Sequence, residues 1–327
     1  MYKLKLTKLT PYLLSAASVI FAGQFLYYTI QSSLSAPNLI WIFLTVFISI
    51  LTFIGLRYEF SLSKAIKVDS NLLNMNKILK SFMIIVLNTL ATFLLATLLD
   101  VSTTFAASLI CVLSTYIFPS NQPEAYSGSV GGMIGSYLCS HWSTALLIGI
   151  VSGITFILFL PYFNGIGGRG GSIPYVASIF SVRLLLLLTP TQGTPIETKY
   201  IVPSFITIMF ITFTTYLLHK YKILTIVRAA MIVVLIGSIL IPNDHNTLLA
   251  ALFAGTVVGM SVEDRLDGPI HLALIAVLCF ILFVPSFHIL EGIGGKLGIL
   301  SFIAYHASMG LKITVEQLSL RFMPNKI

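Results

Sequence analysis

The stretch FILFLPYFNGIGGR, residues 156–169, runs from apolar residues through a proline into a glycine-rich turn that ends at a cation. A similar stretch, FILFVPSFHILEGIGGK, occupies residues 280–296. A proline after an apolar run predicts the end of a helix, and glycines permit the tight turn that follows. The chain is therefore predicted to contain the same helix–turn–helix arrangement twice.

The similarity between the two regions extends towards their N-terminal sides. GSVGGM at 128–133 matches GTVVGM at 255–260, with the same offset of 127 residues as the glycine-rich turns (255 − 128 and 292 − 165). The FILF stretches are offset by 124 residues (280 − 156), which requires a compensating gap of three on each side. Three matches in the same order predict an internal repeat.

The composition is that of a membrane protein. Of the 327 residues, 57% are hydrophobic and 9% are charged, whereas soluble domains carry about 25% charged residues. Several apolar runs approach the roughly 20 residues that a helix needs to cross about 30 Å of hydrocarbon. These features predict an all-α polytopic membrane protein with about 12 transmembrane segments. The segments are expected near 11–31, 38–56, 82–99, 102–118, 125–139, 143–162, 172–189, 201–218, 224–241, 247–262, 270–286 and 297–313.

Basic residues mark one end of the predicted spans. The clusters are Lys3 to Lys8, Arg57 to Lys80, His219 to Lys222, and the tail with Arg321 and Lys326. Twelve crossings place all four clusters on one side of the membrane, as the positive-inside rule requires of the cytoplasmic side. The sequence thus predicts a multi-pass plasma membrane protein whose N- and C-termini are both cytoplasmic.

The topology and the repeat together predict the domain organisation. Residues 1–81 form two extra N-terminal helices and a basic cytoplasmic loop, residues 82–200 hold the first copy, and residues 201–327 hold the second copy and a cytoplasmic tail. Each copy contains five segments, an odd number, so the second is predicted to be inverted relative to the first. The short segments 125–139 and 247–262 are either full spans or tilted, broken or re-entrant helices.

The predicted inversion bears on function. Inverted-topology repeats are typical of transporters, in which two halves exchange roles as access alternates. The leading prediction is a transporter or channel for a small solute, with a central site between the copies. The alternatives are a membrane-embedded enzyme acting on a lipid-linked substrate and a non-catalytic subunit of a membrane complex. An enzyme would need a convergent catalytic set, for which the sequence offers the adjacent Asp244 and His245 and, near a span end, His141.

The two glycine-rich turns are the first candidate binding elements. Gly167–Gly168 in one turn and Gly294–Gly295 in the other permit a close approach of backbone to a ligand. The N–H groups of the following helix, with Arg169 or Lys296 beside them, would make an anion site in each copy. The alternative, with equal weight, is that both turns lie at the surface and their cations face lipid phosphates.

Small and acidic residues supply the other candidates. Ser127, Ser129 and Thr256 would line a pathway where the copies meet, although their glycine neighbours also fit simple helix packing. Glu124 and Asp244 stand at the entrances to these segments. Carboxylates within a bilayer are functional by default, but the flanking prolines and asparagines suggest loops, where they need no special role.

Composition and spacing also limit cofactors and partners. Cys111, Cys139 and Cys279 lie in apolar runs without metal-ligand spacing, so no cofactor or metal is predicted. The net charge of +8 gathers at span ends and forms no basic stripe, so nucleic acid is not a predicted partner. The predicted partners are the lipid bilayer and a small-molecule solute, with an anion favoured by the two glycine-flanked cations. A homo-oligomer is left open.

Overall fold

The chain folds into an all-helical bundle. The computed structural model describes residues 2–35, 39–63, 75–135, 137–138, 141–160, 162–186, 193–242 and 245–322. Within these ranges the regular structure is helical, and each of the twelve predicted segments overlaps one α-helix. The helices are α1 (Tyr2–Ser35), α2 (Leu39–Ser63), α3 (Met75–Leu98), α4 (Thr103–Ile117), α5 (Gln122–Gly131), α6 (Trp142–Phe159), α7 (Arg169–Leu186), α8 (Thr198–Lys220), α9 (Ile226–Leu240), α10 (Asn246–Gly259), α11 (Pro269–Ser286) and α12 (Lys296–Phe322).

The helices differ in their capacity to cross a membrane. Six of them, α2, α3, α6, α8, α11 and α12, are long and apolar enough by length and composition. The apolar helices α4, α9 and α10 are shorter, with 14 or 15 residues. Helix α5 has 10 residues, which rise only about 15 Å and so reach roughly halfway through the hydrocarbon. The helix predicted at 125–139 thus ends earlier than expected, at Gly131.

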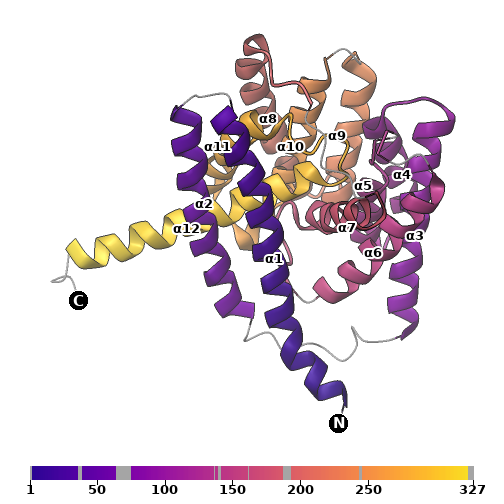
Figure 1. The fold of residues 1–327 in the computed structure, drawn as a ribbon, viewed down its shortest axis with the longest axis horizontal. Coiled ribbons are helices and arrows are strands. Elements are labelled where there is room, and N and C mark those ends of the chain that lie inside the picture. The colour runs from indigo at the N-terminus through magenta and orange to yellow at the C-terminus, as the bar shows by residue number, and fades with distance from the viewer. Residues whose placement is uncertain are drawn as a thin grey trace.

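Figure 1 shows how the helices are arranged. The pair α1 and α2 lies along one side of the bundle, and α3, α4 and α6 lie on the other side. Helix α12 starts inside the bundle, crosses α2 and extends beyond it. The largest buried apolar cluster joins α7, α11 and α12 to α1 and α2 through residues such as Phe25, Ile48, Tyr175, Phe283 and Ile303. The N-terminal pair is thus packed into the same core as the rest.

One end of the bundle carries a concentration of basic side chains. Lys80 at the start of α3 lies over the ring of Phe118 at the end of α4, 5.9 Å from its centroid. Thr225 Oγ1 donates a hydrogen bond to Gln122 Oε1 at 2.6 Å, which joins the start of α9 to that of α5. We call this end, with Lys77, Lys80, Lys220 and Lys222, the basic face. The end with Asp100, Glu197 and Glu291 is the opposite face.

The basic face also holds α2 against both halves of the remaining chain. Arg265, between α10 and α11, forms an ion pair with Glu59 of α2 at 2.9 Å. Its Nε donates to the carbonyl oxygen of Asn164, between α6 and α7, at 2.9 Å. Because Glu59 is buried, loss of its partner would leave an uncompensated carboxylate, which is costly. Arg265 therefore fixes three separate segments at one point.

Helices α2 and α12 cross with their backbones in contact. A Cβ added at Gly310 would lie 1.9 Å from the carbonyl oxygen of Leu51, and one added at Gly55 would lie 1.9 Å from that of His306. Such contacts are available only to glycine, and small residues are how helices approach closely in lipid. The position of α12 relative to the N-terminal pair therefore depends on these two glycines.

We expect Gly310→Ala to destabilise the protein, because the new methyl group would have to push the α2 backbone away. Overpacking of this kind costs about 1–3 kcal/mol, and rigid backbone leaves little room to relax. The thermal unfolding midpoint of the purified protein in detergent measures the loss. Gly23→Ala is the matched control, since its Cβ would meet only the Phe53 ring at 3.6 Å. Equal midpoints for the two variants would contradict the close crossing.

Candidate functional site

Helices α7 and α12 begin at the two glycine-rich turns and cross each other near their N-termini. A Cβ added at Gly298 of α12 would lie 2.4 Å from the Cα of Gly171 in α7. The turns before the two helices share their unusual backbone conformation. Positive φ angles occur at Phe163, Gly165 and Gly168 (57°, 80° and 91°) and again at Leu290, Gly292 and Gly295 (53°, 73° and 82°).

Each turn packs onto the helix that follows the other turn. A Cβ at Gly168 would lie 2.5 Å from the carbonyl oxygen of Gly298, and one at Gly295 would lie 2.2 Å from that of Gly171. The predicted close approach of backbone at these glycines is therefore present, but what approaches is protein backbone. The same holds for the other two candidates: Gly167 packs against the end of α10 and Gly294 against the end of α5.

Arg169 holds the end of α6. Its Nη2 donates to the carbonyl oxygens of Phe159 and Leu160 at 2.8 and 3.2 Å. Its Nη1 donates to Asn164 Oδ1 at 2.6 Å, and the guanidinium lies over the Phe156 ring at 5.7 Å. The last carbonyls of a helix have no partner within the helix, so a cation that receives them stabilises its C-terminus.

Lys296 does the same for α11. Its Nζ donates to the carbonyl oxygens of Phe287 and Ile289 at 2.5 and 2.8 Å, and it lies over the Phe287 ring at 5.7 Å. A lysine ammonium has three hydrogens, so two backbone bonds leave one for another partner. Lys296 also lines a cavity, and Arg169 is not part of that cavity's lining.

This cavity opens at the opposite face and has a volume of about 320 Å³. One wall comes from the start of α4 and the end of α5, with Thr103, Thr104 and Met133. The others come from the start of α10 and from the turn between α11 and α12. Residues from both predicted copies therefore enclose it, and we call it the opposite-face cavity.

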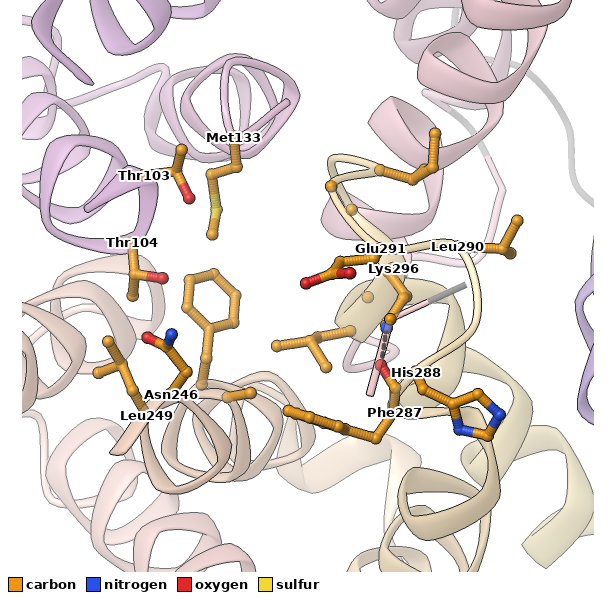
Figure 2. Close-up of a pocket in the computed structure, with 18 of the residues that line it drawn as sticks. Thr103, Thr104, Met133, Asn246, Leu249, Phe287, His288, Leu290, Glu291 and Lys296 are labelled. Atoms are coloured by element: carbon orange, nitrogen blue, oxygen red, sulfur yellow. Dashed lines mark hydrogen bonds between the residues drawn. The ribbon is translucent and has the colours of Figure 1, made fainter. Parts of the chain in front are cut away.

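Figure 2 shows how its side chains lie. The Glu291 carboxylate points into the space from one wall, towards Thr103, Thr104 and Asn246 on the other. The Lys296 amine is on the same wall as Glu291 and is bonded to the Phe287 carbonyl. The His288 ring points away from the middle, and its Nε2 shares a hydrogen bond of 2.9 Å with Ser32 Oγ. Burial and the nearby Lys296 ammonium lower the pKa of His288, which favours the neutral ring. The cavity thus presents one cation, one carboxylate, two hydroxyls and an amide to a solute.

The predicted polar residues of α5 and α10 are buried away from this cavity. Ser129 Oγ donates to the carbonyl oxygen of Ala125 at 2.8 Å, and Thr256 Oγ1 donates to that of Phe253 at 2.7 Å. Ser127 Oγ is buried and finds no hydrogen-bond partner among the residues that the structure describes. These side chains satisfy their own helices or remain unpaired within the packing.

Of the two predicted carboxylates, Glu124 and Asp244, the structure describes only Glu124. Glu124 is buried in the first turn of α5, where Ser81 Oγ and Asn121 Nδ2 donate to its Oε1 at 2.7 and 3.2 Å. It is thus part of a hydrogen-bonded junction between α3 and α5. Asp244 lies outside the described residues. Its neighbour His245 shares a hydrogen bond of 2.8 Å with the Tyr200 hydroxyl.

Sequence reasoning missed Thr103, Thr104, Asn246 and His288, which line the cavity. The two threonines directly follow Ser102, whose side chain caps α4, so in the sequence they look like an ordinary helix start. The only local signal was the position of Glu291 and Lys296 on either side of a glycine-rich turn. Among the described residues, no group of three or more His, Cys, Asp or Glu side chains is arranged to hold a metal ion.

Comparisons with known protein families, with curated proteins and with solved structures find no match to this chain. The cavity and the helices around it are therefore the basis for any functional assignment.

We expect Arg169→Met to lower the thermal unfolding midpoint of the protein in detergent, because the Phe159 and Leu160 carbonyls would lose a charged partner. Hydrogen bonds to charged groups contribute about 1.5–3 kcal/mol each. Lys77→Met removes the same charge from an exposed position on α3 and serves as the control. If both variants unfold at the wild-type midpoint, Arg169 does not hold the end of α6.

Proposed function

We propose that the protein is a membrane transporter or channel for a small polar solute. The observation that carries the proposal is the opposite-face cavity, because it lies between residues 82–200 and 201–327 and both contribute polar side chains to it. Its volume of about 320 Å³ falls at the small end of ligand pockets, which span about 300–1,000 Å³. A site between two halves that can rearrange is the arrangement that transport requires.

We also propose that residues 82–200 and 201–327 are two copies of one unit. Two hydrogen bonds between the halves support this proposal, because the donor comes from the first half in one bond and from the second half in the other. Gly135 N donates to the carbonyl oxygen of Gly292 at 2.9 Å, and Val262 N donates to that of Gly165 at 3.0 Å. The donors are 127 residues apart (262 − 135), and so are the acceptors (292 − 165). If two copies are related by a two-fold axis, each contact from the first copy to the second has an equivalent contact from the second copy to the first.

A second set of contacts within each half also favours two copies. A Cβ added at Gly128 of α5 would meet the carbonyl oxygen of Ile85 in α3 at 2.5 Å, and one at Gly255 of α10 would meet that of Ile208 in α8 at 2.8 Å. Thr89 and Thr212 then donate to the carbonyl oxygens of the same two glycines at 2.9 and 3.1 Å.

The opposite directions of α3 and α8 support inversion of the second copy. Helix α3 starts at the basic face, near Lys77 and Lys80, whereas α8 ends there, at Lys220. If the basic face is cytoplasmic, as the positive-inside rule favours, the opposite-face cavity opens to the outside. Both termini are then proposed to lie in the cytoplasm, and the chain in the plasma membrane.

The groups in the cavity favour a solute that carries an acidic group and hydrogen-bonding groups. Lys296 has one N–H beyond its two backbone bonds, and an ammonium donates strongly to a carboxylate or phosphate. Thr103, Thr104 and Asn246 offer donors and acceptors on the facing wall. The Glu291 carboxylate on the Lys296 side would repel a second negative charge, so a solute with a single negative charge fits best.

Solute flux in proteoliposomes tests the function. We expect uptake of at least one member of a panel of small monoanions and neutral polar solutes. We further expect Thr104→Val and Asn246→Leu to slow that uptake about 3- to 10-fold, the effect of losing one hydrogen bond of about 0.5–1.5 kcal/mol. Thr207→Val is the control for the threonine change, because Thr207 of α8 is half-buried and lies outside the cavity lining.

Lys296→Met separates the anion from the neutral solutes in the same assay. Its expected effect is a selective loss of anion flux, because the neutral side chain no longer attracts negative charge. The thermal midpoint of this variant is measured in parallel, since Lys296 also holds the end of α11. Flux of every solute at the rate of protein-free vesicles would contradict the proposed function.

A further inference from the structure

A second cavity lies at the basic face, between the turn that joins α4 to α5 and the turn that joins α8 to α9. Its volume is about 600 Å³, and Gln122, Lys222, Thr225 and Arg228 are among its lining residues. The hydrogen bond from Thr225 to Gln122 ties the two turns together, and Gln122 Nε2 donates to the carbonyl oxygen of Pro119 at 3.0 Å. The cavity is therefore a built feature of the junction between the two halves of the chain.

The ionisable side chains that line this cavity are all basic. His219, Lys222 and Arg228 belong to its walls, and no aspartate or glutamate does. The Lys222 side chain is exposed, and no ion pair or hydrogen bond connects it to any residue that the structure describes. A positive cavity of this kind repels cations and attracts an anion.

Arg228 is fixed in place before any ligand binds. Its Nε and Nη2 donate to the hydroxyl and carbonyl oxygens of Thr115 at 3.3 and 2.8 Å. The guanidinium stacks on the Tyr116 ring, 4.1 Å from its centroid. Its Nη1 is left without a bond to the described residues, so it can donate to a ligand. Because the side chain is already ordered, binding costs little of its conformational entropy.

Large exposed side chains lie next to the two cations of the cavity, in sequence or by contact. Tyr116 and Ile117 at the end of α4, and Tyr221 and Ile223 on either side of Lys222, are each between 59% and 68% exposed. In a membrane protein such side chains face lipid, and tyrosine is enriched at the level of the headgroups. Lys222 and Arg228 are thus expected to lie at the level of the phosphate groups of one leaflet.

We propose that this cavity binds the phosphate group of an anionic lipid, with Lys222 and Arg228 as its ligands. Basic pockets between membrane helices are the sites where acidic headgroups are held, and arginine matches the geometry of phosphate oxygens. The lipid would contact the turns of both halves at once. Since a ligand stabilises the state that binds it, the lipid strengthens the junction between α4 and α9.

Native mass spectrometry of the detergent-purified protein tests this site, using phosphatidylglycerol and phosphatidylcholine with the same acyl chains. We expect phosphatidylglycerol to bind more tightly than phosphatidylcholine. Lys222→Gln should weaken phosphatidylglycerol binding about five-fold, the contribution of one basic residue near an anionic surface. Lys77→Gln, which removes an exposed lysine of the same face, should leave it unchanged. The readout does not involve transport, so its failure and that of the proposed function are distinguishable.

Two further arms complete the test. The double variant Lys222→Gln and Arg228→Gln should weaken binding further, and its thermal midpoint without lipid establishes whether it is folded. Inorganic phosphate should not compete at the concentration at which phosphatidylglycerol saturates the site. Equal binding of both lipids, equal effects of Lys222→Gln and Lys77→Gln, or displacement by equimolar inorganic phosphate would each overturn the proposal.

Discussion

The backbones of α7 and α12 are in contact at Gly171 and Gly298, and this contact determines how the two halves of the chain meet. With a Cβ at either position the two helices could not meet. If they could not meet, the turns at Gly168 and Gly295 could not rest on each other's following helix. These turns hold the ends of α5 and α10 through Gly294 and Gly167. The glycines therefore allow α5, α7, α10 and α12 to pack closely where the two halves of the chain meet.

A second constraint follows from the membrane itself. Helices that end within or near a bilayer must find partners for their last carbonyl groups, because little water is present to receive them. Arg169 and Lys296 supply those partners for α6 and α11. This explains in physical terms why a cation follows each glycine-rich turn. Lys296 does more than this, because its remaining donor borders a cavity that Arg169 does not reach.

The sequence predicted the helices well, whereas the candidate cavity depends on contacts that only the fold creates. Each of the twelve segments predicted from apolar runs overlaps one helix. The paired glycines were predicted to let backbone approach a ligand, and in the structure they pack against other backbone. The predicted segment 125–139 runs past the end of α5, which lies at Gly131. Arg169 and Lys296 were predicted as paired ligands of a solute, which stays a prediction. Their bonds to helix carbonyls depend on tertiary contacts that the sequence does not show. Thr104 and Asn246 are 142 residues apart (246 − 104), and only the fold brings them to one cavity.

The orientation of the two halves underlies the whole account, and labelling of two corresponding residues tests it most directly. Asn164 and Glu291 are 127 residues apart (291 − 164) and both are exposed, in the turns before α7 and α12. Cysteine is introduced at each position and treated in intact cells with a membrane-impermeant maleimide, with the unaltered chain as background. We expect Glu291→Cys to be labelled in intact cells and Asn164→Cys only after the membrane is opened. Labelling of both from the same side would contradict it.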